Sequence, residues 1–168
     1  MEPIPSFKID HLRLKAGLYI ARMDIIDDST VITTFDIRMK RPYQEEIMST
    51  GSIHAIDHIA ETFMRNDPLW GNKIIYFGPM ASRTGFYLVV VGEVNTETIL
   101  PLIERTFDYI SDFEGDIPGA TPKECGFCVD MDLDEAKRDA TLYYNLLIDA
   151  RKDNFNYPKP RKSRKTQE

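Results

Sequence analysis

The chain has 168 residues, of which 42% are hydrophobic, and it carries a formal net charge of −6. This length and apolar content suffice for one domain with a substantial core. No apolar run approaches the roughly 18 residues of a membrane-spanning helix, and the N-terminus lacks a basic segment followed by an apolar one. The sequence therefore predicts a soluble, unsecreted, cytoplasmic protein with no membrane partner.

Charge is divided unevenly along the chain. Residues 151–168 carry seven Lys or Arg against Asp153 and Glu168, so the preceding body is strongly acidic. We therefore expect no nucleic-acid binding by the body. We predict a single domain over residues 1–152 and a basic, disordered tail over residues 153–168. Contact of this tail with an acidic partner or a nucleic acid is the alternative.

The first predicted elements form a hairpin. Residues 16–26 are typical of a strand, which ends at Asp27-Asp28-Ser29, and residues 30–38 are its predicted partner. Alternation along the second strand places Arg38 on the face opposite Phe35 and Ile37. Arg38 could therefore project from the sheet towards a site.

The next element contains two of the three histidines of the chain, in His54-Ala55-Ile56-Asp57-His58. On a helix, His54, Asp57 and His58 fall on one side, so two imidazoles can converge on a metal ion beside a carboxylate. The spacing is a variant of H-x-x-E-H with aspartate in place of glutamate. The alternative is a pair of ordinary surface histidines.

This helix is predicted to begin near Ser49–Ser52 and to end before Pro68. Strands are predicted over residues 73–77 and 86–94, with a loop over residues 78–85 where a site could lie. Further helices are predicted over residues 96–113 and from the capping box Asp132–Glu135 towards Lys152. Together these elements predict an α+β fold, an antiparallel sheet packed against helices.

Cys125 and Cys128 are the only cysteines of the chain. They lie too close together to staple the fold usefully, and reduced thiols are expected without export. The pair resembles half of a structural zinc site, but no second C-x-x-C follows. We therefore interpret Cys128 as a core residue or a neighbour of a site.

Several short motifs, in order, resemble the LuxS family of S-ribosylhomocysteine lyases over roughly residues 6–150. All three histidines fall on family motif positions. The motifs are Ser6-Phe7, Asp10-His11, Phe35-Asp36-Ile37-Arg38, Ile53-His54 through His58, Phe63-Met64-Arg65-Asn66, Pro79-Met80, Arg83-Thr84-Gly85-Phe86-Tyr87 and Cys125-Gly126.

The resemblance implies an α/β sandwich of the LuxS/metallopeptidase-like kind, which forms a homodimer with active sites at the subunit interface. It implies one Fe(II) or Zn(II) per subunit, held by His54, His58 and Cys125. Such a metal acts as a Lewis acid on a small sugar substrate. The implied reaction cleaves S-ribosylhomocysteine to homocysteine and 4,5-dihydroxy-2,3-pentanedione, the precursor of the autoinducer-2 signal.

The resemblance also assigns roles to residues outside the metal site. Ser6, His11 and Arg38 match positions that hold the substrate, with the N-terminal pair reaching the neighbouring subunit's site. Ser82 and Asp57 match the two acid/base positions, which in the family are a loop cysteine and a glutamate. A serine hydroxyl stays protonated where a thiol titrates at about pH 8.5.

Two further differences accompany Ser82. The carboxylate of Asp57 is one methylene shorter than that of a glutamate, so its oxygens retreat by roughly 1 Å, a displacement that can cost about a hundredfold in rate. Tyr76 stands where the family typically has an aspartate. Glu61, one turn beyond His58, is a candidate to supply the carboxylate instead, or else an ordinary exposed glutamate.

Three hypotheses follow. The first is an active, metal-dependent S-ribosylhomocysteine lyase in which Ser82 orients solvent or substrate. The second is a catalytically impaired relative that keeps the metal and binds S-ribosylhomocysteine or a similar sugar without normal turnover. A metallopeptidase is the third, but the loop and cysteine motifs belong to the lyases.

Overall fold

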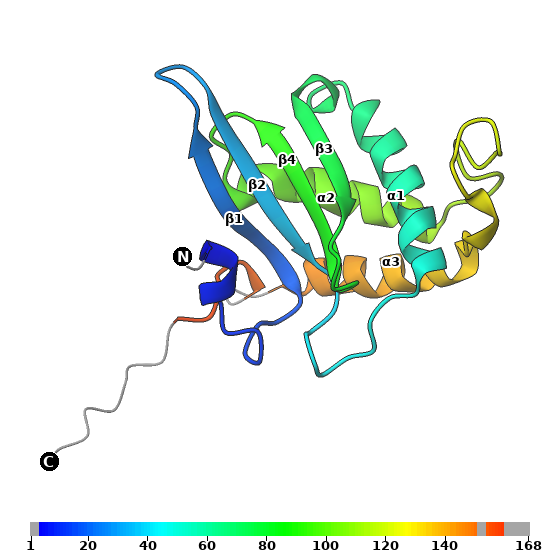
Figure 1. Ribbon diagram of the computed structural model, residues 1–168, viewed down its shortest axis with the longest axis horizontal. Coiled ribbons are helices and arrows are strands. Elements are labelled where there is room, and N and C mark those ends of the chain that lie inside the picture. The colour runs from blue at the N-terminus through cyan, green and yellow to red at the C-terminus, as the bar shows by residue number, and fades with distance from the viewer. Residues whose placement is uncertain (1–3, 151–153, 160–168) are drawn as a thin grey trace, which may run out of the picture.

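The computed structural model describes residues 4–150 and 154–159. It contains one antiparallel sheet with the strand order β1-β2-β4-β3. The strands are β1 (Gly17–Ile25), β2 (Val31–Arg38), β3 (Ile74–Pro79) and β4 (Gly85–Val91). Three long helices, α1 (Thr50–Arg65), α2 (Thr96–Ser111) and α3 (Leu133–Ile148), pack on one side of it (Figure 1). The predicted α+β class is confirmed.

The core lies between the sheet and the three helices. Phe35 and Ile37 of β2 point into it and are fully buried, as are Ile56 of α1, Leu102 of α2 and Ala140 of α3. Alternation along β2 therefore places Asp36 and Arg38 on the opposite face. The predicted placement of Arg38 on the face opposite Phe35 and Ile37 is confirmed.

Polar caps fix where the helices begin. The Ser49 side chain accepts a hydrogen bond from the Ser52 N–H at the start of α1, and Asp132 accepts from the Glu135 N–H at the start of α3. Each cap satisfies one of the free amide groups of a first helical turn. The Glu135 side chain does not complete a capping box, because its carboxylate accepts from the Ser49 hydroxyl instead. This contact joins the starts of α1 and α3.

The predicted boundary between domain and tail differs from the structure. α3 ends at Ile148, earlier than the predicted approach to Lys152, which lies outside the described residues. Residues 154–159, predicted to be disordered, instead pack against β1, where Asn154 donates to the Ala16 carbonyl and Phe155 contacts the core. Lys159 is the only basic residue of this segment, and its aromatic side chains pack against the domain. Residue 153 and residues 160–168 of the predicted tail lie outside the described residues.

None of the helices within residues 4–150 and 154–159 combines the length and the apolarity that crossing a bilayer requires.

Candidate metal centre

His54, His58 and Cys125 form one compact group of half-buried side chains. The histidines lie on successive turns of α1, and Cys125 lies in the segment between α2 and α3. Their nitrogen and sulfur ligand atoms all lie within 4.8 Å of one another, and the Cys125 Sγ is 3.2 Å from the His54 Nε2. The fold thus unites two residues of one helix with a cysteine 67 positions further along the chain, since 125 − 58 = 67.

Hydrogen bonds to their Nδ1 atoms orient both imidazoles. His54 Nδ1 donates to the Asp130 carboxylate at 2.7 Å, and His58 Nδ1 donates to the Pro118 carbonyl at 2.8 Å. A carbonyl or carboxylate oxygen only accepts, so each Nδ1 carries a proton, and in the neutral imidazole each Nε2 then keeps the lone pair that can bind a metal. This is the arrangement in which a carboxylate or carbonyl holds a metal-ligating histidine.

The loop beside His58 needs a glycine. Gly119 has φ +69°, a left-handed conformation that favours glycine, and a Cβ there would lie 3.3 Å from His58 Nδ1. The absence of a side chain lets the Pro118 carbonyl approach the imidazole closely. Gly119 therefore helps to set the orientation of His58.

The donor set fits a transition metal. Two imidazole nitrogens and one thiolate suit Zn(II) or Fe(II), and three protein ligands leave one tetrahedral position for a substrate or water. Cys128 is outside the group, and both cysteines are free thiols. Cys128 is the first residue of the short helical turn Cys128–Asp130, and the last residue of this turn, Asp130, accepts the hydrogen bond from His54. Among the described residues, no four-ligand structural zinc site forms.

Asp57 lies beside the three candidate metal ligands His54, His58 and Cys125, here called the metal-ligating group, and one of its oxygens has no hydrogen-bond partner among the described residues. Its carboxylate lines an open pocket of about 440 Å³ together with His58, Glu61 and Gly119. The buried Oδ1 atom has no hydrogen-bond partner among the described residues. Burial, and then the charge of Glu61, raise the pKa of Asp57 to about 6. This carboxyl can therefore change protonation near neutral pH.

Glu61 is engaged elsewhere. Its Oε1 accepts from Arg65 Nε at 2.8 Å, and Arg65 also donates to the backbone carbonyls of Ile74 and Ile75 at the start of β3. Glu61 therefore influences Asp57 through its charge, while its own carboxylate is paired with a cation. No described hydrogen bond joins Glu61 to the two histidines.

Ser82 lies in the turn between β3 and β4. Its hydroxyl is 2.8 Å from the Thr84 hydroxyl, and Arg83 between them has φ +56°. The Met48 N–H donates to the Arg83 carbonyl, which ties this turn to the residue before the cap of α1. The turn and the first turns of α1 lie at the same end of the sheet (Figure 1). Within the described part of the chain, no hydrogen bond joins Ser82 to the metal-ligating group.

Arg38 is buried, with only 5% of its surface exposed, and Nη2 forms an ion pair with Asp36 Oδ2 at 2.8 Å. Its Nη1 donates to the Thr84 hydroxyl, so Arg38 and Ser82 share a neighbour. Its Nε has no hydrogen-bond partner among the described residues. A buried, unsatisfied donor on a cation can accommodate a polar or anionic ligand group.

The N-terminal residues stand apart from this network. Ser6 lies in the short helical turn Pro5–Lys8, and His11 Nδ1 donates to the Ile9 carbonyl. Neither side chain forms a described hydrogen bond with the metal-ligating group or with Arg38. Phe7 between them is 75% exposed. In a single chain, therefore, the predicted site residues are only partly brought together.

Tyr76 lies on β3 and contacts its own strand. It is half exposed on β3, and its hydroxyl lies over Gly78, where a Cβ would be 1.9 Å from that oxygen. Tyr76 therefore covers a glycine two positions along its own strand. A residue larger than glycine at position 78 would therefore displace the Tyr76 ring.

Sequence reasoning missed Asp130, Pro118 and Thr84. The Asp130 contact with His54 spans 76 residues and the Pro118 contact with His58 spans 60. No local pattern in the sequence marks such distant partners. Thr84 was noted as part of a motif, but its bridge between Arg38 and Ser82 depends on the β2–β4 pairing of Arg38 with Gly85.

Comparison with known proteins yields one consistent result. A model of the S-ribosylhomocysteinase (LuxS) family matches residues 4–154. An S-ribosylhomocysteine lyase of Phocaeicola vulgatus is 46% identical over 159 residues, 94% of this chain and 98% of the relative. Those of Porphyromonas gingivalis and Clostridium beijerinckii are 45% and 47% identical, each over 94% of this chain and 99% of the relative.

Proposed function

Because the chain belongs to the S-ribosylhomocysteinase (LuxS) family, we propose that it is a metal-dependent S-ribosylhomocysteine lyase. Its substrate would be cleaved to homocysteine and 4,5-dihydroxy-2,3-pentanedione. The observation that carries this proposal is the convergence of His54, His58 and Cys125, with both Nδ1 atoms held and both Nε2 lone pairs available. Such a group suits a catalytic metal with one open position.

The proposed ion is one Fe(II) or Zn(II) per subunit, since both accept nitrogen and thiolate ligands. When bound, it would act as a Lewis acid towards the carbonyl and hydroxyl oxygens of the sugar. Cys125 must be a thiolate to bind it, and both cysteines are free thiols. This requirement supports a cytoplasmic location, where thiols stay reduced.

Proton transfer is assigned to Asp57. Its carboxylate belongs to the lining of the open pocket beside His58, where it could take a proton from a substrate carbon and return it to a neighbour. Ser82, whose hydroxyl stays protonated, would donate or relay a hydrogen bond rather than act as a base.

Substrate binding is assigned to Arg38, Ser6 and His11. The free Nε of Arg38 supports a contact with a polar substrate group. Ser6 and His11 do not reach the metal-ligating group of their own chain, which supports their action in the site of a second subunit. We therefore propose a homodimer with its sites at the interface. The helices cover one side of the sheet (Figure 1), and exposed Ile25, Ile75 and Val91 support association through the strands.

A catalytically impaired relative that keeps the metal and binds this substrate, or a similar sugar, is the second candidate. Ser82 and Asp57 at the two acid/base positions, and Tyr76 at a position where the family typically has an aspartate, favour it. The short carboxylate and the missing thiol both reduce the capacity for proton transfer. The metal site itself does not distinguish the two candidates.

Homocysteine release from S-ribosylhomocysteine tests the proposal. Protein reconstituted anaerobically with Fe(II) is compared with metal-free protein in a thiol-release assay, and substrate binding is measured by calorimetry. Metal-dependent release is the expected result. Binding without release would establish the impaired relative. The absence of both binding and release would exclude both candidates.

A further inference from the structure

We propose that residues 154–159, here called the C-terminal strap, hold Arg38 in the orientation in which it binds substrate. Tyr157 is the positioning residue through which they act. This inference rests on the proposed function, in which Arg38 contacts the substrate.

The strap is anchored tightly at the start of β1. Asn154 Nδ2 donates to the Ala16 carbonyl at 2.8 Å, and a Cβ on Gly17 would lie 2.0 Å from the Asn154 carbonyl oxygen. Only glycine permits this approach. Tyr143 of α3 also donates to the Gly17 carbonyl at 2.8 Å. The strap therefore begins from a fixed point between β1 and α3.

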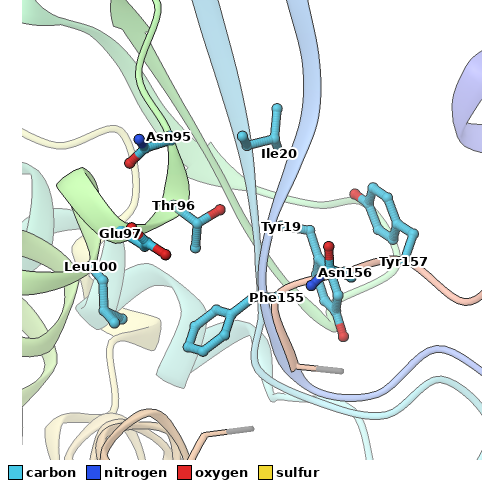
Figure 2. A pocket seen from close by; sticks show the side chains of 9 residues that line it. All are labelled: Tyr19, Ile20, Asn95, Thr96, Glu97, Leu100, Phe155, Asn156 and Tyr157. Carbon is cyan, nitrogen blue, oxygen red and sulfur yellow. The ribbon is translucent and has the colours of Figure 1, made fainter. Parts of the chain in front are cut away.

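Its two aromatic rings lie on either side of β1. Phe155 points into an open pocket of about 690 Å³ beside Leu100 and the first turn of α2, and it packs against the core. In the view of Figure 2, Phe155 and Tyr157 lie to either side of the β1 ribbon. The strap thus passes around the edge of the sheet, and the partial burial of Phe155 stabilises this path.

Tyr157 is seated on the face of the sheet that carries Arg38. Its ring stacks on Tyr19, with centroids 4.6 Å apart and an interplanar angle of 8°. Its hydroxyl donates to Asp36 Oδ2 at 2.8 Å. Burial, and then the Asp36 charge, raise the pKa of Tyr157, so the hydroxyl remains a donor at any physiological pH.

The same Asp36 oxygen holds Arg38. Arg38 Nη2 donates to Oδ2 at 2.8 Å, whereas the buried Asp36 Oδ1 has no partner among the described residues. Tyr157 therefore supplies one of the two described side-chain donors to this carboxylate. Loss of the Tyr157 hydroxyl would leave the buried Asp36 carboxylate with one hydrogen bond fewer, which is unfavourable for a buried charge. Asp36 would then turn, and the guanidinium would move with it.

This chain of contacts continues into the proposed site. Arg38 Nη1 donates to the Thr84 hydroxyl, which is 2.8 Å from the Ser82 hydroxyl. At the other end of the strap, the Lys159 carbonyl accepts a hydrogen bond from Arg13 Nη1 at 2.9 Å. Arg13 lies two residues after His11 in the sequence. The strap therefore contacts Asp36, the ion-pair partner of Arg38, and Arg13, which lies near His11 in the sequence. A small displacement of such groups is costly in rate.

Tyr157→Phe is the test, because it removes one hydroxyl and keeps the stacked ring. Tyr144→Phe of α3 is the matched control, since Tyr144 is partly buried and no described hydrogen bond involves its hydroxyl. We expect Tyr157→Phe to weaken binding of S-ribosylhomocysteine, or to raise its KM, by about tenfold. Metal content, melting temperature and the Tyr144→Phe protein should change little.

A second readout does not require turnover. The guanidinium protons of Arg38 are followed by NMR, with the signal assigned by its loss in Arg38→Lys. In Tyr157→Phe their exchange with water should accelerate by about tenfold, as expected when a buried ion pair loosens. Asp36→Asn should reproduce both effects.

The two readouts separate failure of this inference from failure of the proposed function. Unchanged exchange at Arg38 in Tyr157→Phe, or substrate affinity that falls equally in Tyr144→Phe, overturns the role of the strap. Faster exchange with unchanged affinity also overturns it as a device for substrate binding. Faster exchange in a protein whose wild type binds no S-ribosylhomocysteine supports the hold on Arg38 and overturns the proposed function instead.

Discussion

The metal-ligating group and the proposed acid/base residues are built differently, although they lie at the same end of the sheet. Both histidines have partners that fix them, in Asp130 and Pro118. Asp57 has a buried oxygen without a described partner, and the Ser82 hydroxyl is occupied by Thr84. The difference indicates that metal binding and proton transfer can vary separately. Substitutions that slow turnover can thus leave the metal centre intact.

Loss of the thiolate should break the metal centre completely. We expect Cys125→Ala to lower metal affinity by more than about a hundredfold, because only two imidazoles remain. Homocysteine release should fall below detection. Metal content after dialysis against a graded chelator measures the first effect. Cys128→Ala is the control, and an equal loss in that variant would mean that the wrong cysteine is assigned.

Removing the support of His54 should have a smaller effect. Asp130→Asn leaves the three ligands in place but weakens the hold on Nδ1, so metal affinity should fall by about tenfold to a hundredfold. The exposed Asp134→Asn on the first turn of α3 is the control. Unchanged affinity in Asp130→Asn would show that the orientation of His54 does not depend on this carboxylate.

Restoring a thiol should change the acid/base region alone. Ser82→Cys introduces a group that titrates at about pH 8.5, so it can exchange protons where a serine cannot. We expect kcat for homocysteine release to rise by about tenfold, at the low end of a general acid/base contribution. Metal content should stay constant. A fall in metal content would contradict the separation of the two regions.

The smallest expected effect concerns the metal-free protein. The pKa of Asp57 is raised to about 6 in the folded chain, so the folded state binds this proton more tightly than the unfolded state. The protonated Asp57 carboxyl therefore stabilises the folded state fully below about pH 4, and this stabilisation is lost as the pH rises towards 6. Between pH 4 and pH 7, metal-free wild type should lose about 1 kcal/mol relative to Asp57→Asn, after allowance for partial exposure.

Urea unfolding at both pH values, with a chelator present, measures this difference. Equal pH dependence of the two proteins would mean that the unsatisfied Asp57 oxygen carries no energetic cost.

Local signals in the sequence predicted the elements well. The apolar alternation of β2 and the caps Ser49 and Asp132 act within a few residues, and the structure places these elements as expected. The spacing of His54 and His58 indicated a metal site by itself, whereas Cys125 came from the family resemblance. Local patterns predict the helices, the strands and the side chains on one face of each, because they reflect the period of a helix or a strand.

Contacts between distant segments could not be predicted in this way. Asp130 reaches His54 only because α3 packs beside α1, and Tyr157 reaches Asp36 only because the chain turns around the edge of β1. The basic residues after position 150 indicated disorder. That prediction gave no weight to Phe155 and Tyr157, whose partly buried rings pack against the core and on Tyr19.

His54, His58 and Cys125 should together bind one metal ion. X-ray absorption spectroscopy of the chain loaded with one equivalent of Zn(II) identifies the atoms bound to the metal. We expect one sulfur at about 2.3 Å, two imidazole nitrogens at about 2.0 Å and one further light atom. Two sulfurs, or none, would contradict it.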